Sequence, residues 1–348
     1  MARRKNKKII ILQLKSTQDP PAFDNISGII KKIRDEQGYR IRGHEVHQVA
    51  GVMRRTSVAE RAEMVSRFCA RNDLEYLTYH APVLAPGCNL WEKDEKKRER
   101  VIESLQLTAR EAEMVSRQVA LAAPPVVVFH LTSYVPLAQL PPTHGRRIEM
   151  LQKAGAEFAR LFGSKEKGDD ARPRRSSSYT FAVENTYPRL KSSGSFGNIG
   201  PFHPAELARL TADMKCGTTL DLAHYQLYSN YLKYGRGNRI GDLDRQANGR
   251  RAPGWQECIE TLGDALVQLH ISDARGTTID GEALPLGKAS GGEIPVASVL
   301  QAVIDNNNNN NNKKVIQGTL ELRNGHLDGA RAQLESARWL LENARQVF

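Results

Sequence analysis

Short apolar runs rich in β-branched residues alternate along the chain with longer stretches whose apolar residues recur every three or four positions. The short runs predict strands at residues 9–14, 43–49, 74–79, 125–129, 179–183, 218–222, 266–271 and 314–322. The longer stretches predict helices at residues 26–37, 57–71, 92–122, 146–162, 204–213, 255–265, 294–304 and 328–347. At the start of the second helix, Ser57 and Glu60 have the spacing of a capping box. Strands that alternate with helices indicate a parallel sheet with crossover helices.

This order predicts an α/β fold, a single (β/α)8 TIM-barrel domain that covers residues 1–348. Eight strand–helix units suit a barrel, and the 348 residues exceed the roughly 250 typical of that fold, which leaves room for loop insertions. We expect loop insertions at residues 164–178 and 232–254, and an asparagine-rich surface loop at 305–313. An open doubly wound sheet is the alternative, but no glycine-rich dinucleotide fingerprint follows the first strand.

The composition narrows the class of protein. The chain carries 50 Lys and Arg against 39 Asp and Glu, a net charge of +11, which is compatible with an anionic partner such as nucleic acid or a phosphorylated small molecule. A 40% hydrophobic share with 26% charged residues excludes collagenous, wholly disordered and disulfide-scaffold classes. No apolar run reaches the roughly 18–20 residues of a membrane span. Four dispersed cysteines without a C-x-x-C pair predict a reducing, cytoplasmic location.

Histidine and acidic residues recur where the predicted strands end. From the third strand to the eighth, the residues at or just after each end are His80, His130, Glu184, Asp221 with His224, His270 and Glu321. In a barrel these ends converge on one face, where active sites of this architecture lie. So many imidazoles and carboxylates gathered at one face of the barrel need a cation that compensates the negative charge of the carboxylates. The pattern therefore predicts a site for a divalent ion, and histidine nitrogens combined with carboxylate oxygens suit zinc, manganese or iron.

Other polar residues near these ends have less distinctive patterns. Asp273 is expected to cap the backbone or to hold His270, and His44 and His47 lie on a weak strand and are expected to be structural. Tyrosines recur every third residue after the sixth strand, which fits either a platform for stacking bases or a helix face packed on the barrel: Tyr225, Tyr228, Tyr231 and Tyr234.

Several motifs occur in an order that resembles the xylose-isomerase-like TIM barrels, a superfamily that includes sugar isomerases, sugar epimerases and the endonuclease IV enzymes. The resemblance covers most of the chain and rests on His80-Ala81-Pro82, Val128-Phe129-His130, Glu184-Asn185-Thr186, Asp221-x-x-His224, His270-x-x-Asp273, Pro285-Leu286-Gly287, Gly292-Glu293-Ile294 and Glu321. No single motif among these is specific, but their combination is.

The resemblance implies a divalent-metal enzyme with particular ligands. The residues that match the four ligands of the single-metal epimerases are Glu184, Asp221, His270 and Glu321. His80 and His130 match the pair that holds a second metal in the endonuclease branch, with a glutamate at the Glu184 position as the bridge, and His224 matches a ligand of its third zinc. One departure is clear: an Asp-x-His pair expected near residues 280–283 is replaced by Asp280-Gly281-Glu282-Ala283, in which Asp280 or Glu282 would have to substitute. With this departure, the resemblance implies one or two divalent ions, zinc or manganese, rather than the three zinc ions of the endonuclease branch.

The function predicted first is isomerisation or epimerisation of a sugar or sugar phosphate. Through the resemblance, the metal would stabilise an enediolate while Glu184 and Glu321 act as the acid/base pair. Basic residues near the site would bind the substrate: Lys233, Arg236, Arg275 and Arg323. The alternative is an endonuclease IV-like two-metal phosphodiesterase acting on abasic DNA. A third reading is a non-catalytic, metal-binding barrel.

Overall fold

Eight parallel strands close into a barrel in the part of the chain that the structure, a computed structural model, describes: residues 10–83, 87–163, 178–188, 196–235, 239–287, 291–309, 314–323, 325 and 328–348. The barrel strands are β1 (Ile10–Thr17), β2 (Gly43–His47), β3 (Tyr76–His80), β4 (Val126–Phe129), β6 (Thr180–Glu184), β8 (Gly217–Asp221), β9 (Leu266–Ile271) and β10 (Ile316–Leu320). Each strand pairs with its neighbours in sequence, and β1 pairs with both β2 and β10, which closes the sheet. The predicted (β/α)8 barrel is thereby confirmed.

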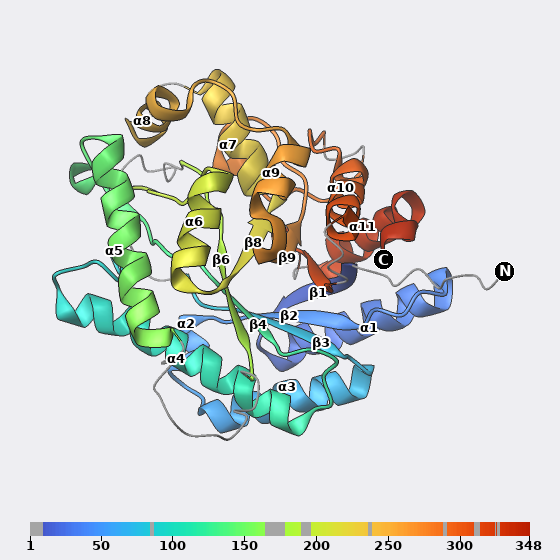
Figure 1. Ribbon diagram of the computed structural model, residues 1–348. Coiled ribbons are helices and arrows are strands. Elements are labelled where there is room, and N and C mark those ends of the chain that lie inside the picture. Colours follow the sequence, from blue (N-terminus) through green and yellow to red (C-terminus); the bar gives the residue numbers. More distant parts are fainter. Residues whose placement is uncertain are drawn as a thin grey trace.

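Helices surround the barrel on its outside (Figure 1). They are α1 (Pro20–Gln37), α2 (Ala50–Met53), α3 (Val58–Asn72), α4 (Glu95–Gln118), α5 (His144–Phe162), α6 (Pro204–Met214), α7 (Leu222–Tyr234), α8 (Arg239–Asn248), α9 (Trp255–Leu262), α10 (Val296–Asn309) and α11 (Arg331–Asn343). The predicted capping box begins α3: Ser57 Oγ accepts from the Glu60 backbone N–H, and the Glu60 carboxylate accepts from that of Ser57. A short antiparallel pair, β5 (Val135–Pro136) and β7 (Phe196–Gly197), lies apart from the barrel sheet.

Two segments expected to be loops contain helix. Residues 232–254 include the end of α7 and all of α8, whose Arg245 side chain bonds back to the Tyr231 carbonyl of α7. The asparagine run also begins as helix, because α10 continues to Asn309. Val299, Leu300 and other apolar residues of α10 are buried, so tertiary packing outweighs the weak helix propensity of asparagine. Residues 164–177 and 310–313 lie outside the described residues.

The barrel interior contains a layer of hydrogen-bonded polar side chains where branched apolar residues usually dominate. The buried residues of this layer come from β1, β3, β9 and β10: Gln13, Thr78, Gln268, Gln317 and Thr319. Thr319 Oγ1 donates to Gln13 Oε1 at 2.7 Å, Gln268 Nε2 donates to Thr319 Oγ1 at 2.6 Å, and Thr78 Oγ1 donates to Gln317 Oε1 at 3.0 Å. This layer supports the polar residues that lie nearer the carboxyl ends of the strands.

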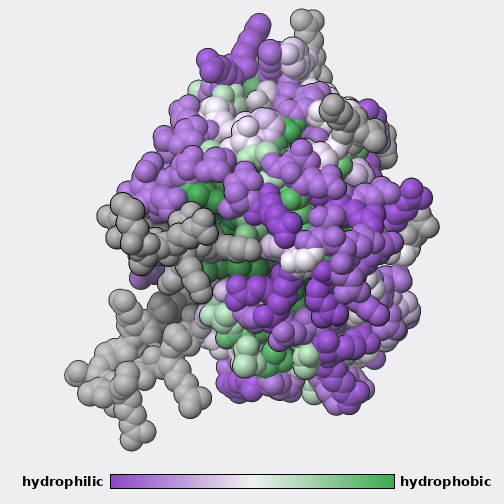
Figure 2. All heavy atoms as spheres, turned by 90° about the vertical axis from the view of Figure 1, so that its right-hand side faces the viewer, coloured by the Kyte–Doolittle hydropathy of each residue, from purple (hydrophilic) through white to green (hydrophobic). Residues whose placement is uncertain are grey.

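Apolar packing between barrel and helices forms the main core. The inward faces of α1, α3, α5 and α11 contribute Ile26, Val65, Phe158 and Leu340, which are almost fully buried. Figure 2 shows one outer face of the molecule, on which hydrophilic side chains predominate and hydrophobic residues appear mainly in the recesses between them. Within the described ranges, no helix has the length and apolar character needed to cross a bilayer.

Candidate metal centre

The carboxyl ends of the barrel strands bring the predicted histidines and acids together. His80, Glu184 and Asp221 are the last residues of β3, β6 and β8, and Glu321 directly follows β10. Side chains of a strand alternate between the two faces of the sheet, and these residues have the parity that points inward. In the β8–β9 register Asp221 lies opposite His270, so that neighbouring strands place both at the same height.

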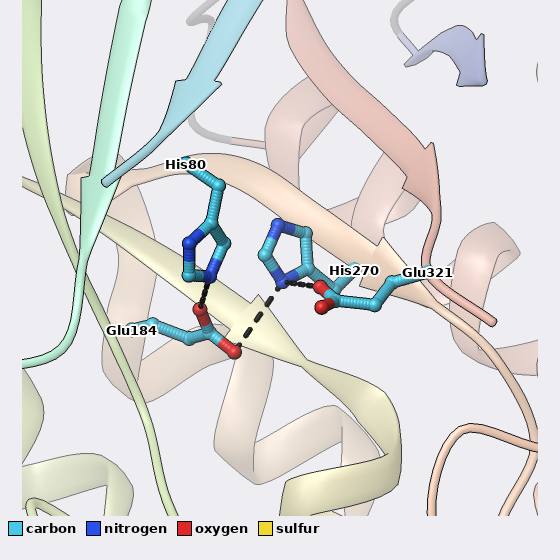
Figure 3. A group of neighbouring side chains, drawn as sticks. All are labelled: His80, Glu184, His270 and Glu321. Atoms are coloured by element: carbon cyan, nitrogen blue, oxygen red, sulfur yellow. Dashed lines mark hydrogen bonds and ion pairs between the residues drawn. The ribbon is translucent and has the colours of Figure 1, made fainter. Parts of the chain in front are cut away.

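Glu184 lies at the middle of this group. Its Oε2 is 3.1 Å from His80 Nε2 and 3.1 Å from His130 Nε2. Its Oε1 is 3.2 Å from His224 Nδ1 and 3.3 Å from His270 Nδ1. The side chain is 1% exposed, and Figure 3 shows it between His80 and His270. One buried carboxylate therefore faces a different pair of imidazoles with each of its oxygens.

His270 Nδ1 faces three carboxylates. It lies 3.3 Å from Glu184 Oε1 and 3.8 Å from Asp221 Oδ2, and it contacts Glu321 Oε2 (Figure 3). The other ring nitrogen, Nε2, is 3.0 Å from a carboxylate oxygen of Glu45. A proton on Nε2 would be held by Glu45 and would leave Nδ1 as the nitrogen with a free lone pair, which is the usual arrangement of a metal-ligating histidine.

The donor atoms at this position fit a divalent cation. Four of them are buried and have no hydrogen-bond partner of acceptable geometry among the described residues: Glu184 Oε1, Glu321 Oε2, His130 Nε2 and His270 Nδ1. Buried polar atoms are normally paired, because leaving one unpaired costs about 1–3 kcal/mol. Imidazole nitrogens combined with carboxylate oxygens suit zinc or manganese. Ligand atoms of His80, Glu184, His270 and Glu321 all lie within 4.8 Å of one another.

Charges at the centre shift one another's pKa values. Burial favours the neutral acid, but the imidazoles of His270 and His130 hold the pKa of Glu184 well below its ordinary value. At Glu321, His270 and Lys15 likewise outweigh burial and lower the pKa of the carboxyl. Burial opposes the charged form of His270, yet the surrounding carboxylates, Glu321 foremost, raise its pKa well above the ordinary value. In the absence of metal, protons on the imidazoles compensate the carboxylates.

Asp221 and His224 link the centre to α7. Asp221 Oδ1 accepts from the backbone N–H of His224 at 2.7 Å and so caps this helix. Burial raises the pKa of Asp221 to about 6. Burial disfavours a charged His224, but Asp221 and the Glu184 and Glu282 carboxylates raise the pKa of its imidazole well above the ordinary value. His224 thus lies in contact with the centre through Nδ1 and with a further acid through Nε2.

Glu282 is that further acid and lies in the segment where the motif departs from the family pattern. Its Oε1 is 2.9 Å from His224 Nε2, while its Oε2 accepts from the Tyr187 hydroxyl at 3.0 Å and from Arg323 at 3.2 Å. Of the two possible substitutes in residues 280–283, Glu282 is therefore the one beside the centre, whereas Asp280 is exposed.

The centre opens into a cleft of about 290 Å³. Its lining combines residues of the centre with the apolar Val83 and several hydroxyl and amide side chains: His80, His130, His224, Glu282, Glu321, Thr132, Thr186, Tyr187 and Asn198. A second hollow of about 170 Å³ lies over β1, β2 and β10 and shares His47 and Glu321 with the first. Hydrogen-bonding groups around a metal site are suited to a polyhydroxylated molecule.

The residues predicted to bind substrate occupy different surroundings. Arg323 contacts the Glu282 carboxylate at the edge of the centre. Arg275 and Lys233 are exposed, and Lys233 Nζ lies 4.7 Å from the Tyr234 ring centroid. Arg236 falls outside the described residues. Substrate binding by these four side chains remains a prediction.

Other sequence expectations differ in outcome. Asp273 Oδ1 accepts from the backbone of Ala274 and Ile294, as expected of a cap, whereas the residue that holds His270 is Glu45. His44 is structural, buried against Phe23 and Phe68. His47, expected to be structural, instead lines both hollows with its ring centroid 5.0 Å from that of His80. The tyrosine row is largely a packed helix face: Tyr225, Tyr228 and Tyr231 are buried and Tyr234 is exposed.

Two important residues were not anticipated, Lys15 on β1 and Glu45 on β2. Lys15 Nζ lies 2.7 Å from Glu45 Oε1 and 2.6 Å from Glu321 Oε1. The alternation of inward and outward residues along a barrel strand could have revealed both. Lys15 is a charged residue within a run of buried strand residues, and Glu45 lies between His44 and Val46 in a strand that the barrel must bury.

A second group of potential ligands lies away from the centre, His144, Glu206 and Asp244. The buried Arg147 already lies among them, with its guanidinium 3.1 Å from Glu206 Oε2 and 2.6 Å from Asp244 Oδ1. The Tyr228 hydroxyl also donates to Asp244. Because a guanidinium supplies the positive charge here, this cluster is a structural ion network between α5, α6 and α8.

Comparisons with known proteins agree with the barrel fold. No protein-family model and no curated protein matches the sequence. Among solved structures, a D-tagatose 3-epimerase-like protein matches with a TM-score of 0.57 at 15% identity, over 96% of this chain and 97% of its own. A D-psicose 3-epimerase from Clostridium cellulolyticum H10 gives 0.57 at 11% identity, over 97% and 98%. An IolI protein with a bound zinc atom gives 0.50 at 12% identity, over 96% and 99%. This chain therefore shares its fold with sugar 3-epimerases, and its resemblance to the xylose-isomerase-like barrels is confirmed at the level of the fold.

Proposed function

We propose that the protein is a divalent-metal-dependent isomerase or epimerase of a sugar or sugar phosphate. The observation that carries this proposal is the position of two carboxylates, Glu184 and Glu321, which both face His270 Nδ1. Glu321 lines the cleft, and Glu184 lies buried against His80 and His130, which also line it. Both carboxyls have lowered pKa values and are therefore ionised near neutral pH. Two ionised carboxylates, one lining a cleft with hydroxyl and amide groups and one in contact with its lining, are groups that could carry out proton transfer at carbon.

The proposed ligands are Glu184, Asp221, His270 and Glu321. When bound, the metal would act as a Lewis acid toward the carbonyl and hydroxyl oxygens of the sugar. One glutamate would remove the proton from the carbon next to the carbonyl, and the electron pair would move into the enediolate of the sugar. The other glutamate would return a proton to the opposite face of that carbon, which inverts its configuration. Glu184 and Glu321 come from β6 and β10, so they can approach a bound molecule from different sides.

Solvent isotope exchange tests this proposal. Incubation of the metal-loaded protein with ketohexoses and their phosphates in D2O should place deuterium at the carbon beside the carbonyl and yield the epimer or isomer. Glu321→Gln should abolish exchange, whereas Glu206→Gln alters a buried carboxylate of the Arg147 cluster and should leave exchange intact. Absence of exchange with every sugar offered to metal-loaded protein would contradict the proposal and favour a non-catalytic barrel.

A second candidate is a two-metal phosphodiesterase acting on abasic DNA. It is favoured by one observation: Glu184 Oε2 lies 3.1 Å from the Nε2 atoms of both His80 and His130, while Oε1 faces His270. In this alternative, Glu184 together with His80, His130 and His270 would hold two ions, and a two-ion site would stabilise both oxygens of an in-line displacement at phosphorus. The net charge of +11 would favour contact with a DNA backbone.

Metal counting and a cleavage assay separate the two candidates. One tightly bound ion per chain together with sugar epimerisation supports the first proposal. Two ions per chain and chelator-sensitive incision of a duplex that contains an abasic site would support the second and overturn the first.

A further inference from the structure

A buried lysine connects to the candidate centre without being one of its proposed ligands. Lys15 lies on β1, and its side chain is only 11% exposed. Its Nζ is 2.6 Å from Glu321 Oε1, whereas the other oxygen of that carboxylate, Oε2, faces His270 Nδ1. The lysine thus holds one carboxylate oxygen and leaves the other oriented toward the position of the ion.

Glu45 makes the corresponding connection to His270. Its Oε2 is 3.0 Å from His270 Nε2 and accepts from Gln268 Nε2 at 3.1 Å, and its Oε1 is 2.7 Å from Lys15 Nζ. The Glu45 side chain is fully buried. Lys15 and Glu45 are therefore paired with each other, and each also contacts a proposed ligand through an atom that the ion does not need.

The surroundings hold this pair in place. The Lys15 backbone N–H donates to Gln333 Oε1 at 3.0 Å, and the Gln333 amide donates to the Lys15 carbonyl, so β1 is fixed to α11 at this residue. Glu45 rests on the polar layer of the barrel interior through Gln268. Without Lys15, the fully buried Glu45 carboxylate and the partly buried Glu321 carboxylate would lie in one region without compensation, and the ammonium of Lys15 removes that cost.

We propose that Lys15 and Glu45 form a positioning pair that holds Glu321 and His270 in the orientation needed to bind the divalent ion. This inference rests on the metal centre of the proposed function but not on the reaction. Partners that orient metal ligands typically contribute 10- to 100-fold to affinity.

A purely electrostatic role of Lys15 predicts a change in metal affinity of the opposite sign. If the ammonium only repelled a dication, removing its charge would tighten metal binding. If it positions Glu321, removing it weakens binding although a positive charge is lost. The direction of the change therefore distinguishes the two roles.

The experiment measures Mn²⁺ affinity of the metal-free full-length protein by competition with a chromophoric chelator. Lys15→Met and Glu45→Gln should each weaken binding about 10- to 100-fold, and Lys15→Arg should restore most of the affinity lost in Lys15→Met. The double variant should lose no more than about the larger single loss, because the pair acts as one unit. The Co²⁺ absorption spectrum should change in the variants if the ligand geometry changes.

Arg61→Met is the matched control, because Arg61 pairs with Glu111 in another fully buried ion pair, and its replacement should lower stability without changing Mn²⁺ affinity. Thermal unfolding of each metal-free variant reports whether it is folded. Unchanged or tighter Mn²⁺ binding by a folded Lys15→Met, or an equal loss in Arg61→Met, would overturn the positioning role while leaving the proposed function in place. Failure of the wild-type protein to bind Mn²⁺ or Co²⁺ would overturn both.

Discussion

Replacing Glu184 with glutamine tests the centre most directly. The substitution keeps the shape of the side chain and removes its charge. It affects all four imidazoles around the carboxylate, those of His80, His130, His224 and His270, which lie between 3.1 and 3.3 Å from its oxygens. No other carboxylate in the described part of the centre faces so many imidazoles. We expect the loss of metal binding and of any metal-dependent activity.

The size of the effect follows from these distances. At 3.3 Å, the separation of Glu184 and His270, two unit charges attract by about 5 kcal/mol at an effective dielectric constant of roughly 20. A dication at a similar distance would be attracted more strongly, and desolvation offsets part of that attraction. Breaking a buried ion pair costs about 3–5 kcal/mol. At about 1.4 kcal/mol per decade, Glu184→Gln should weaken metal binding by on the order of 10²- to 10³-fold.

Isothermal titration of metal-free protein with Zn²⁺ or Mn²⁺ measures this change. The control is Glu206→Gln, which also neutralises a buried carboxylate beside a cation but lies in the Arg147 cluster. Its metal affinity should match that of the wild type. If Glu184→Gln bound the ion within threefold of the wild-type affinity, Glu184 would not be a ligand and the centre as described here would be wrong.

Three further predictions concern ion number, pH and stability. His80→Ala should retain one ion per chain and most epimerase activity, and loss of one of two ions in metal analysis would instead favour the phosphodiesterase. Metal-free protein should become less stable as pH rises from about 6.5 to 8. The pKa values of His270 and His224 are raised in the folded state, which therefore keeps protons that the unfolded chain releases over this range. A melting temperature that rises over this range would contradict the assignment. Arg147→Met should lower the free energy of unfolding by about 3–5 kcal/mol in a denaturant titration, because it leaves Glu206 and Asp244 buried without their cation, and it should not alter metal affinity.

The barrel could be predicted because its strands carry a strong local signal. Runs such as Val126–Phe129 are apolar throughout, as strands covered on both faces must be, and they alternate with amphipathic helices. The segment that contains α8 was harder, because Gly241 and several charged residues give it the composition of a loop. Its helix is fixed by tertiary contacts, including that of Asp244 with Arg147.

The candidate centre was predictable in part for a related reason. His80, Glu184 and Asp221 interrupt apolar strands at their ends, where a polar residue is conspicuous. Glu45 lies instead in the polar strand Gly43–His47, and its parity indicates burial only once this segment is assigned to a strand of a closed barrel. Lys15 is similar, since only closure of the barrel between β1 and β10 brings it against Glu321. Long-range pairing of this kind is not encoded in the spacing of residues along one strand.

The polar layer inside the barrel limits how this sequence can evolve. The members of the layer bond to one another, as Gln268 does to Thr319, and Gln268 also donates to Glu45 outside it, so one apolar replacement leaves neighbouring groups unpaired at a cost of about 1–3 kcal/mol each. Exchanges that are harmful alone should become tolerable only in combination, which is strong epistasis. Among homologous barrels, these positions should therefore be replaced as a block, and ancestral intermediates with half of the layer exchanged should be rare.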